Sequence, residues 1–428
     1  MPGADDLSKF ESASAWIGRK VYLKEGVIVR DGNQILIVPQ PAIVGDVERH
    51  MLWLERAWVR EVDVMSADEA MEVCSQRICE SPNHMFAWRM RASVLSEKGK
   101  YESAIQDFTE AIRLDPQDPL TYVLRGATWL ERGEAEKARQ DCQRAIRISP
   151  RFAPAYHGRG VALRYQGKVD EAMRDYSTAI RLDPTFARAF YSRAVVWHNR
   201  NDFNKALADY KEALRINPKY PLALYGRGIT WHNLGALDLA VKDYTEAIRV
   251  APDYAPNFYG RGIVLRQQGH LVQAVQDYTE AIRLDPKYAL AYYHRGVAWH
   301  YKGDYDAALK DYVESLQLDP NYAMAHYGSG VIWHNKSNYD KACAAYSEAI
   351  RIDPKYTLAY LHRGAVRQIQ GDLESAIRDF DCAIQLEPKN ADAYRDRAAA
   401  WEKLGNPRKA TKDRRTAERI ESSVKKSS

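Results

Sequence analysis

Four Trp-His pairs are the residues of this chain whose type and spacing first suggest chemistry. The pairs begin at Trp197, Trp231, Trp299 and Trp333, at intervals of 34, 68 and 34 residues, and three of them continue with Asn. Imidazole side chains bind metals, transfer protons and hydrogen-bond to partners. The motif therefore marks a metal site, a catalytic site, a binding surface or a repeated piece of core.

All four pairs belong to a 34-residue repeat. Counting Met85 as position 1, ten repeats run without insertion to about Val424. The repeats share an aromatic residue at position 4, Arg at 7, a small residue at 8, a bulky one at 11, usually Gly at 15, Ala at 20, an aromatic at 24 and Pro at 32. Positions 4, 8 and 11 form one helical face, as do 20, 24 and 27. Each repeat is thus predicted to be a helix pair that must stack on its neighbours to bury its apolar surface.

Position 7 and position 23 vary together along the array. Nine of the ten repeats have Arg at 7 and Asp at 23, and the exceptional repeat has Ser329 and Ala345 instead. A pair between successive repeats would lose its members in neighbouring repeats, whereas here both losses fall in one repeat. We therefore predict a structural Arg–Asp ion pair inside each repeat.

The repeat resembles the tetratricopeptide repeat. Its signature W-x2-L-G-x2-Y…A-x3-F…P is matched by Phe258, Arg261, Gly262, Leu265, Ala274, Tyr278 and Pro286. The resemblance covers about 340 of 428 residues and departs mainly in having Arg for Leu at position 7. It implies a mainly α fold, a right-handed α-solenoid of helix-turn-helix repeats. It also implies a non-catalytic interaction scaffold whose first helices line a concave groove for peptides.

The groove residues implied by the resemblance lie at positions 5, 12 and 13 of repeats 4 to 8, while the tryptophans at position 11 are predicted to be core. This set is Tyr191, Tyr225, Tyr259, Tyr293, Tyr327, His198, His232, Arg266, His300, His334, Asn199, Asn233 and Asn335. The stripe is either a ligand lining or packing between repeats, because Tyr and His have apolar bodies and polar tips. As a lining it suits a partner with aromatic or aliphatic anchors and some acidic character, and protonation of the histidines near pH 6 would make binding pH-sensitive.

Other chemistries fit the pattern poorly. Zinc needs three or four ligands within roughly 2.0–2.3 Å of one point, whereas neighbouring first helices lie roughly 10 Å apart. No Cys, Asp or Glu stands at position 12 or 13 of repeats 4 to 8. Acid–base catalysis needs differently tuned groups at one reacting atom, and a periodic array supplies equal ones. We expect no metal, no cofactor and no enzymatic activity. The Lys and Asn that related co-chaperones place at positions 5 and 9 to clamp a terminal carboxylate are also missing.

The N-terminal part differs from the repeats. Residues 15–64 hold short β-rich runs and an Asp31-Gly32-Asn33 turn, which indicates a hairpin. Together with Trp58-Val59 they weakly resemble bacterial SH3-like modules, which implies a small β-barrel that either binds a ligand or caps the array. Residues 65–84 fit a capping half-repeat helix. The predicted organisation is a flexible segment 1–14, a β domain 15–64, the capping helix 65–84, ten repeats 85–424 and a basic tail 425–428.

Composition limits the location and the partners. The chain has no apolar run long enough to span a membrane, and Asp5, Asp6 and Glu11 stand where a signal peptide needs apolar residues. Five cysteines show no metal-ligand spacing, and we expect a cytoplasmic protein. The formal net charge is +5, with much of the surplus in the last repeat. Binding of nucleic acid or another anionic polymer by the net-basic array is thus the alternative function, and salt dependence would separate it from peptide binding. The partner and the oligomeric state are not predicted.

Overall fold

The computed structural model describes the backbone of residues 20–23, 29–31, 34–36, 42–48, 51–54, 57–60 and 64–425, and the side chains of residues 65–422. The chain forms two compact segments, Met1–Pro252 and Asp253–Ser428, each described here by itself. The sequence analysis predicts one uninterrupted array and gives no sign of this boundary.

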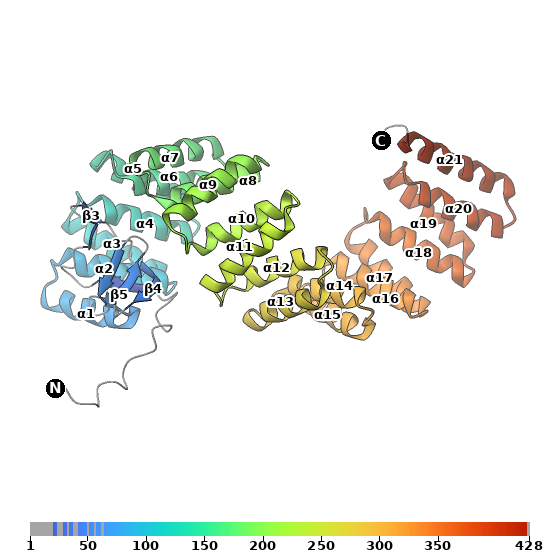
Figure 1. Cartoon of the computed structure of the whole chain (residues 1–428), viewed down its shortest axis with the longest axis horizontal. Helices are drawn as coiled ribbons and strands as arrows, with labels where there is room; N and C mark the ends of the chain where they lie inside the picture. The colour runs from blue at the N-terminus through green and yellow to red at the C-terminus, as the bar shows by residue number, and fades with distance from the viewer. Residues whose placement is uncertain are drawn as a thin grey trace, which may run out of the picture. The chain divides into compact units, whose positions relative to one another are not determined.

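Short strands precede the helices (Figure 1). They are β1 (Lys20–Leu23), β2 (Val29–Asp31), β3 (Gln34–Leu36), β4 (Ala42–Glu48), β5 (Met51–Leu54), β6 (Ala57–Arg60) and β7 (Val64–Met65). An antiparallel sheet has the order β6-β5-β4-β1-β7, and β2 pairs with β3, with Asp31 opposite Gln34 where the sequence predicts a hairpin. These strands do not show an SH3-like barrel. The flexible segment 1–14 and the tail residues 426–428 lie outside the described residues.

The first segment continues as helices that follow the 34-residue period. They are α1 (Ala67–Glu80), α2 (Met85–Glu97), α3 (Tyr101–Leu114), α4 (Pro119–Glu131), α5 (Ala135–Ile148), α6 (Ala153–Tyr165), α7 (Val169–Leu182), α8 (Ala187–Asn199), α9 (Phe203–Ile216), α10 (Pro221–Asn233) and α11 (Leu237–Val250). The lone helix α1 buries Ala70, Cys74 and Ile78 against Met90 and Val94 of α2.

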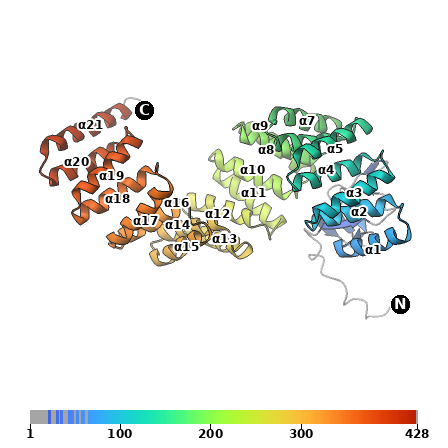
Figure 2. The same ribbon diagram turned by 180° about the vertical axis from the view of Figure 1, so that it is seen from behind.

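The second segment has the same plan. Its helices are α12 (Ala255–Gln267), α13 (Leu271–Leu284), α14 (Ala289–Tyr301), α15 (Tyr305–Leu318), α16 (Ala323–Asn335), α17 (Tyr339–Ile352), α18 (Thr357–Gln370), α19 (Leu373–Leu386), α20 (Ala391–Lys403) and α21 (Pro407–Lys425). In both segments the two helices of a repeat pack on each other, and the second also packs on the first helix of the next repeat. Figures 1 and 2 show this side-by-side stacking from opposite sides. The helix-turn-helix array predicted from the sequence is confirmed.

The turn inside each repeat requires a left-handed residue at position 15. Eight repeats use Gly there, with φ between 72° and 88°. The other two use Asn201, with φ 59°, and Ser337, with φ 56°. Glycine adopts this conformation without steric cost, whereas in other residues the Cβ clashes with the backbone and the conformation is disfavoured. The prediction of a glycine turn is therefore confirmed, and it extends to two repeats that lack the glycine.

The core lies between the helices of each repeat and of its neighbour. Its largest members are aromatic side chains at position 24, such as Tyr278 and Tyr312, which are 0% and 1% exposed. The small residue at position 8 makes room for them, because a Cβ on Gly296 would stand 2.8 Å from Cε1 of Tyr312. Small or aliphatic residues at positions 3 and 10, such as Ala291 and Ile332, are also fully buried. The sequence analysis did not assign these two positions to the core.

The tryptophans at position 11 are predicted to be core, but the structure does not bury them fully. Trp197, Trp299 and Trp333 are partly buried and pack at the edge of the core clusters. A lysine ammonium lies 4.4 Å from each of these rings, as Lys205 does over Trp197. Each indole therefore covers core on one side and binds a cation on the other.

Candidate peptide-binding face

The Arg–Asp pairs link the two helices of a repeat, as predicted. In repeat 7, Arg295 donates from Nε and Nη2 to the two carboxylate oxygens of Asp311, at 2.8 and 2.7 Å. Its Nη1 also donates to Oγ1 of Thr279 in the preceding repeat, at 3.1 Å. The same two-pronged pair joins all nine Arg–Asp combinations in the described chain. These groups are satisfied by one another, so they hold the scaffold rather than a ligand.

The tyrosines at position 5 are part of aromatic clusters inside their own repeats. Tyr259 lies 6.1 Å from Tyr278 and 4.8 Å from Tyr288, measured between ring centroids. The same triad recurs around Tyr191, Tyr293 and Tyr327. Tyr225 also stacks near Tyr244 at 5.8 Å. The stripe is therefore packing at least in part.

Tyr293 departs furthest from the prediction. It is only 8% exposed, whereas the other four position-5 tyrosines are half-buried. Burial raises the pKa of its hydroxyl to about 12. This side chain offers almost no surface to a partner.

The histidine of one Trp-His pair contacts the Asn of the next. Nε2 of His198 lies 3.3 Å from Nδ2 of Asn233, and Nδ1 lies 2.9 Å from Oγ1 of Thr230. Because the Thr230 hydroxyl donates to the carbonyl of Gly226, it accepts from His198 Nδ1, and Nε2 accepts from the amide. The same contact joins His300 Nε2 to Asn335 Nδ2 at 3.4 Å. The spacing of 35 residues, one repeat plus one, is the signal that the sequence analysis missed.

The predicted protonation of these histidines near pH 6 does not fit their surroundings. Burial lowers the pKa of His198 and of His300. Their hydrogen bonds with Asn233 and Asn335 also use Nε2 as an acceptor, which a protonated ring cannot supply. Burial and these hydrogen bonds both favour the neutral ring of His198 and of His300.

The most exposed members of the predicted set stand at position 13. Asn199, Asn233 and Asn335 are exposed, while the position-12 residues His232 and His334 are half-buried. Tyr301 occupies the same position in repeat 7 and is 68% exposed. The groove set predicted from the sequence does not include this tyrosine. We call the position-12 and position-13 residues of repeats 4 to 8 the candidate face.

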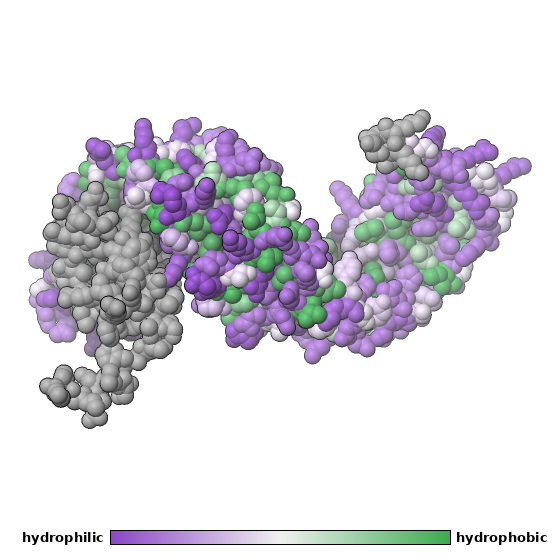
Figure 3. Space-filling view, viewed as in Figure 1, coloured by the Kyte–Doolittle hydropathy of each residue, from purple (hydrophilic) through white to green (hydrophobic). Residues whose placement is uncertain are grey.

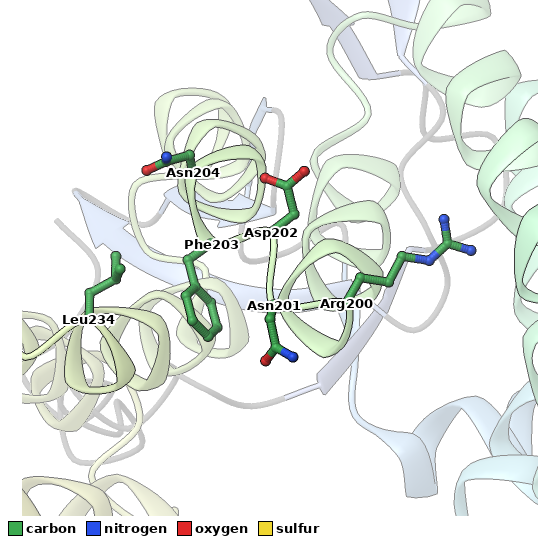
Figure 4. Close-up of a pocket in the computed structure, with 6 residues that line it drawn as sticks. All are labelled: Arg200, Asn201, Asp202, Phe203, Asn204 and Leu234. Atoms are coloured by element: carbon green, nitrogen blue, oxygen red, sulfur yellow. The ribbon is translucent and has the colours of Figure 1, made fainter. Parts of the chain in front are cut away.

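A shallow cavity lies beside this face in the first segment (Figure 4). It has a volume of about 450 Å³ and is lined by Arg200, Asn201, Asp202, Phe203, Asn204 and Leu234. The Phe203 ring also lies 5.3 Å from the ring of His198. Figure 4 shows Phe203 and Leu234 from adjacent elements with polar side chains around them. This cavity was not predicted, because its residues belong to the turn between the helices.

The described side chains form no cluster of groups that could hold a metal ion. Between residues 65 and 422, no three His, Cys, Asp or Glu side chains come together as a metal site. Figure 3 shows hydrophobic patches separated by hydrophilic side chains on the visible face. Among the helices that the structure describes, none is long and apolar enough to cross a membrane.

Family models of the tetratricopeptide repeat match the array. The matched residues are 89–151, 157–221, 199–255, 262–300, 289–322 and 325–356, and together they cover more than half of the chain. The chain belongs to the tetratricopeptide repeat family. Tetratricopeptide repeats generally mediate interactions between proteins, and each matched model describes such repeats.

Solved tetratricopeptide repeat structures are similar to parts of the chain. YrrB, a TPR protein with an unusual peptide-binding site, is 27% identical and covers 43% of this chain and 95% of its own, with a TM-score of 0.38. A repeat protein from Parabacteroides merdae is 19% identical over 58% and 99%, with a TM-score of 0.44. Yeast Tom70 is 18% identical over 79% and 85%, with a TM-score of 0.40. All three scores lie below 0.5, so the family assignment rests on the repeat models. A search of curated proteins gives no match.

Proposed function

We propose that this tetratricopeptide repeat protein is a non-catalytic scaffold that binds a peptide or protein segment on the candidate face of each compact segment. The observation that carries the proposal is the row of exposed position-13 side chains, which stands beside half-buried side chains at position 12 and, except for the buried Tyr293, at position 5. Half-buried aromatic and imidazole groups with exposed polar neighbours combine apolar contact area with hydrogen-bonding capacity. YrrB, similar over part of the chain, is a peptide-binding repeat protein and supports this class of function.

The structure changes which residues should be mutated to test the proposal. Removing the position-5 tyrosines would disturb the aromatic clusters, so lost binding could not be separated from lost packing. We therefore choose Asn199→Ala, His232→Ala and Tyr301→Ala together, since these side chains are exposed or half-buried. The matched control is Leu239→Ala with Val313→Ala, two side chains that are 45% and 50% exposed on second helices.

The test is quantitative affinity capture from cell extract with the wild type, the triple variant and the control. We expect the triple variant to lose partners that the wild type and the control both retain. Equal recovery of the same partners by all three proteins would show that the candidate face is assigned wrongly.

We further propose a cytoplasmic location and a second role for the N-terminal part. All five cysteines are free thiols, which supports a reducing compartment. The N-terminal strands are proposed to form an SH3-like module that either caps the array or contacts a second partner. Deleting residues 1–64 while keeping α1 tests the two roles: loss of array stability indicates a cap, and loss of a partner alone indicates a contact.

A second candidate, binding of nucleic acid or another anionic polymer, is favoured by one feature of α21. Arg408, Lys412, Arg415 and Arg419 share one face of this helix and line a shallow cavity of about 470 Å³. All four are exposed, and no ion pair to a carboxylate engages them within residues 65–422. Anion binding through such a strip should weaken steeply between low and moderate salt, while peptide binding on the candidate face should change little. Titration with a single-stranded oligonucleotide at two salt concentrations separates the candidates.

A further inference from the structure

Position 12 of repeats 3 to 8 carries two kinds of side chain. Repeats 4, 5, 7 and 8 have His there, after a tryptophan. Repeats 3 and 6 have Arg164 and Arg266, after Leu163 and Leu265, at corresponding sites 102 residues apart. The histidines His198 and His300 are bonded to the next repeat, and the question is what the arginines bond to.

Arg266 lies in a polar surrounding without an acid. Its Nε atom is buried and makes no hydrogen bond within residues 65–422, and the same is true of Oη of Tyr278 and Nδ1 of His294. The rings of Tyr278 and His294 stack at 6.2 Å. No Asp or Glu of the described chain forms an ion pair with Arg266. Arg266, Tyr278 and His294 thus belong to one small cluster that joins three successive helices, α12, α13 and α14, and the side chain of Arg266 interacts with that of Tyr278.

The electrostatics of this cluster agree with an unpaired cation. Burial raises the pKa of Tyr278 to about 12, with the charge of Arg266 acting against the rise. Burial also lowers the pKa of His294 to about 4, and the charge of Arg266 lowers it further. At neutral pH the phenol and the imidazole are therefore uncharged. The guanidinium is the net charge of the cluster, and nothing within it neutralises that charge.

The first segment contains a related combination around Arg164, which is exposed whereas Arg266 is half-buried. Oη of Tyr176 is buried without a hydrogen bond in the described part of the chain, and its pKa, raised by burial to about 12, is held down by Arg164. A buried histidine also stands beside this pair, since the ring of His157 lies 5.8 Å from that of Tyr176. Burial lowers the pKa of His157 to about 3, with Arg188 and Arg164 contributing next. An arginine at position 12 beside a buried phenol and a buried imidazole therefore occurs in each compact segment. The histidines differ, because His157 belongs to the repeat of Tyr176 and contacts Oγ of Ser192 at 2.9 Å.

The accessible donors of Arg266 are the two Nη groups. Nε is the one nitrogen of this half-buried side chain that is both enclosed and without a hydrogen bond. A guanidinium presents its N–H groups in a rigid planar fork that matches the two oxygens of a carboxylate.

We propose that Arg266, and Arg164 in the first segment, each bind the carboxylate of an Asp or Glu side chain in the partner peptide. The proposal rests on the proposed function and adds the partner's chemistry: an acidic residue at a fixed place in the bound segment. It differs from a clamp on a terminal carboxylate, because the cation stands at position 12 and is supported by the phenol at position 24 of the same repeat.

The experiment uses the full chain and a displayed library of random dodecapeptides. Selections are made in parallel on the wild type, on Arg164→Gln with Arg266→Gln, and on the control Arg283→Gln. Arg283 is an exposed arginine on α13 that pairs with Glu280, so its removal changes the net charge without touching the cluster. We expect peptides enriched on the wild type and on the control to carry Asp or Glu at one recurring position, and this preference to vanish on the double variant.

A second measurement protects the test against misfolding of the double variant. The most enriched acidic peptide and its version with that residue changed to Gln or Asn are titrated against wild type and Arg266→Lys, which keeps the charge but loses the fork. We expect the acidic peptide to bind the wild type roughly 10-fold more tightly than its amide version, as suits a charge-assisted hydrogen bond. On Arg266→Lys this ratio should fall to about 3-fold or less.

The outcomes separate the two proposals. Enriched peptides with equal acidic content on wild type and double variant would overturn the carboxylate site and leave the scaffold function standing. For a peptide that binds the second segment, an unchanged ratio of affinities for the acidic and amide versions on Arg266→Lys would also overturn the carboxylate site. Absence of any enriched peptide on the wild type would overturn peptide binding itself, and the carboxylate site with it.

Discussion

Nδ1 of His198 donates to Oγ1 of Thr230 across 2.9 Å, and this bond joins two successive repeats. Thr230 is fully buried, and its hydroxyl donates a hydrogen bond to the carbonyl of Gly226 at 2.8 Å. The histidine that first suggested a metal ligand is thus engaged on both nitrogens, by Thr230 and by Asn233. Its role is to hold the contact between repeats 4 and 5.

Removing the acceptor of this bond should weaken the contact between the two repeats. In Thr230→Val the His198 donor loses its partner inside the structure, which costs about 1–2 kcal/mol. Native-state hydrogen exchange should show faster exchange in α8 and α10. The exposed Thr411→Val should change stability by less than about 0.5 kcal/mol. Equal protection of α8 and α10 in wild type and Thr230→Val would mean that the bond contributes nothing.

Acid should destabilise the second segment through His294. The pKa of this buried ring is lowered to about 4, below its unfolded value of about 6.5, so the folded state favours the neutral ring. Its stabilising contribution is fully present above pH 6.5 and is lost as the pH falls from about 6.5 toward 4. At about 1.4 kcal/mol per pKa unit, the full loss amounts to roughly 3.5 kcal/mol, and about 2 kcal/mol of it falls between pH 6.5 and pH 5.

Urea midpoints at pH 7.5 and pH 5 measure the effect. His294→Gln should reduce the difference between the two midpoints, whereas the exposed His270→Gln should leave it as in the wild type. If His294→Gln shows the full acid sensitivity of the wild type, the sensitivity arises elsewhere.

The repeat without an Arg–Asp pair predicts how the others respond to mutation. Repeat 8 has Ser329 and Ala345 where repeat 7 has Arg295 and Asp311. Asp311 is 3% exposed, so Arg295→Ser alone leaves a buried unpaired charge and should cost about 3–5 kcal/mol. Arg295→Ser with Asp311→Ala reproduces repeat 8 and should cost less than that single change. A four-protein double-mutant cycle by urea denaturation gives the coupling directly, and a double variant less stable than Arg295→Ser would refute the expectation.

Substitutions to glycine at two of the left-handed turns should stabilise the folded protein. Asn201 and Ser337 adopt positive φ at position 15, where eight repeats have Gly. Asn tolerates this conformation better than Ser. We expect Ser337→Gly to raise stability by about 0.5–1 kcal/mol and Asn201→Gly by less, since glycine also loses more freedom on folding. Thermal melts of both variants test the order of these stability gains. Gly303 has φ 83°, so Gly303→Ala is expected to lower the melting temperature.

Periodicity made most of the helical fold predictable from the sequence. Helices that follow each other every 34 residues, the left-handed turn and the Arg295–Asp311 type of pair all follow from residues that recur at fixed positions. The pair could be placed within one repeat because Ser329 and Ala345 are lost together, which is information that only a repeated sequence contains.

The candidate site was less predictable, because position in a repeat does not report how far a side chain is covered by its neighbours. Tyr293 and Tyr259 occupy the same position, yet Tyr293 is buried beside Tyr312 and Tyr322. The contact between His198 and Asn233 joins different positions of different repeats, so inspection of one repeat cannot find it. The division after Pro252 likewise depends on packing between helices rather than on the pattern of either one.

The edge position of the tryptophans makes their fluorescence a natural probe of local opening in the array. Trp197, Trp299 and Trp333 each stand between the core of one repeat and the ammonium group of one lysine. Local opening of a repeat would expose the indole to water and remove the cation, and both changes alter its emission. Variants that keep one of these tryptophans would therefore let an optical experiment follow the fraying of a chosen repeat without any attached dye.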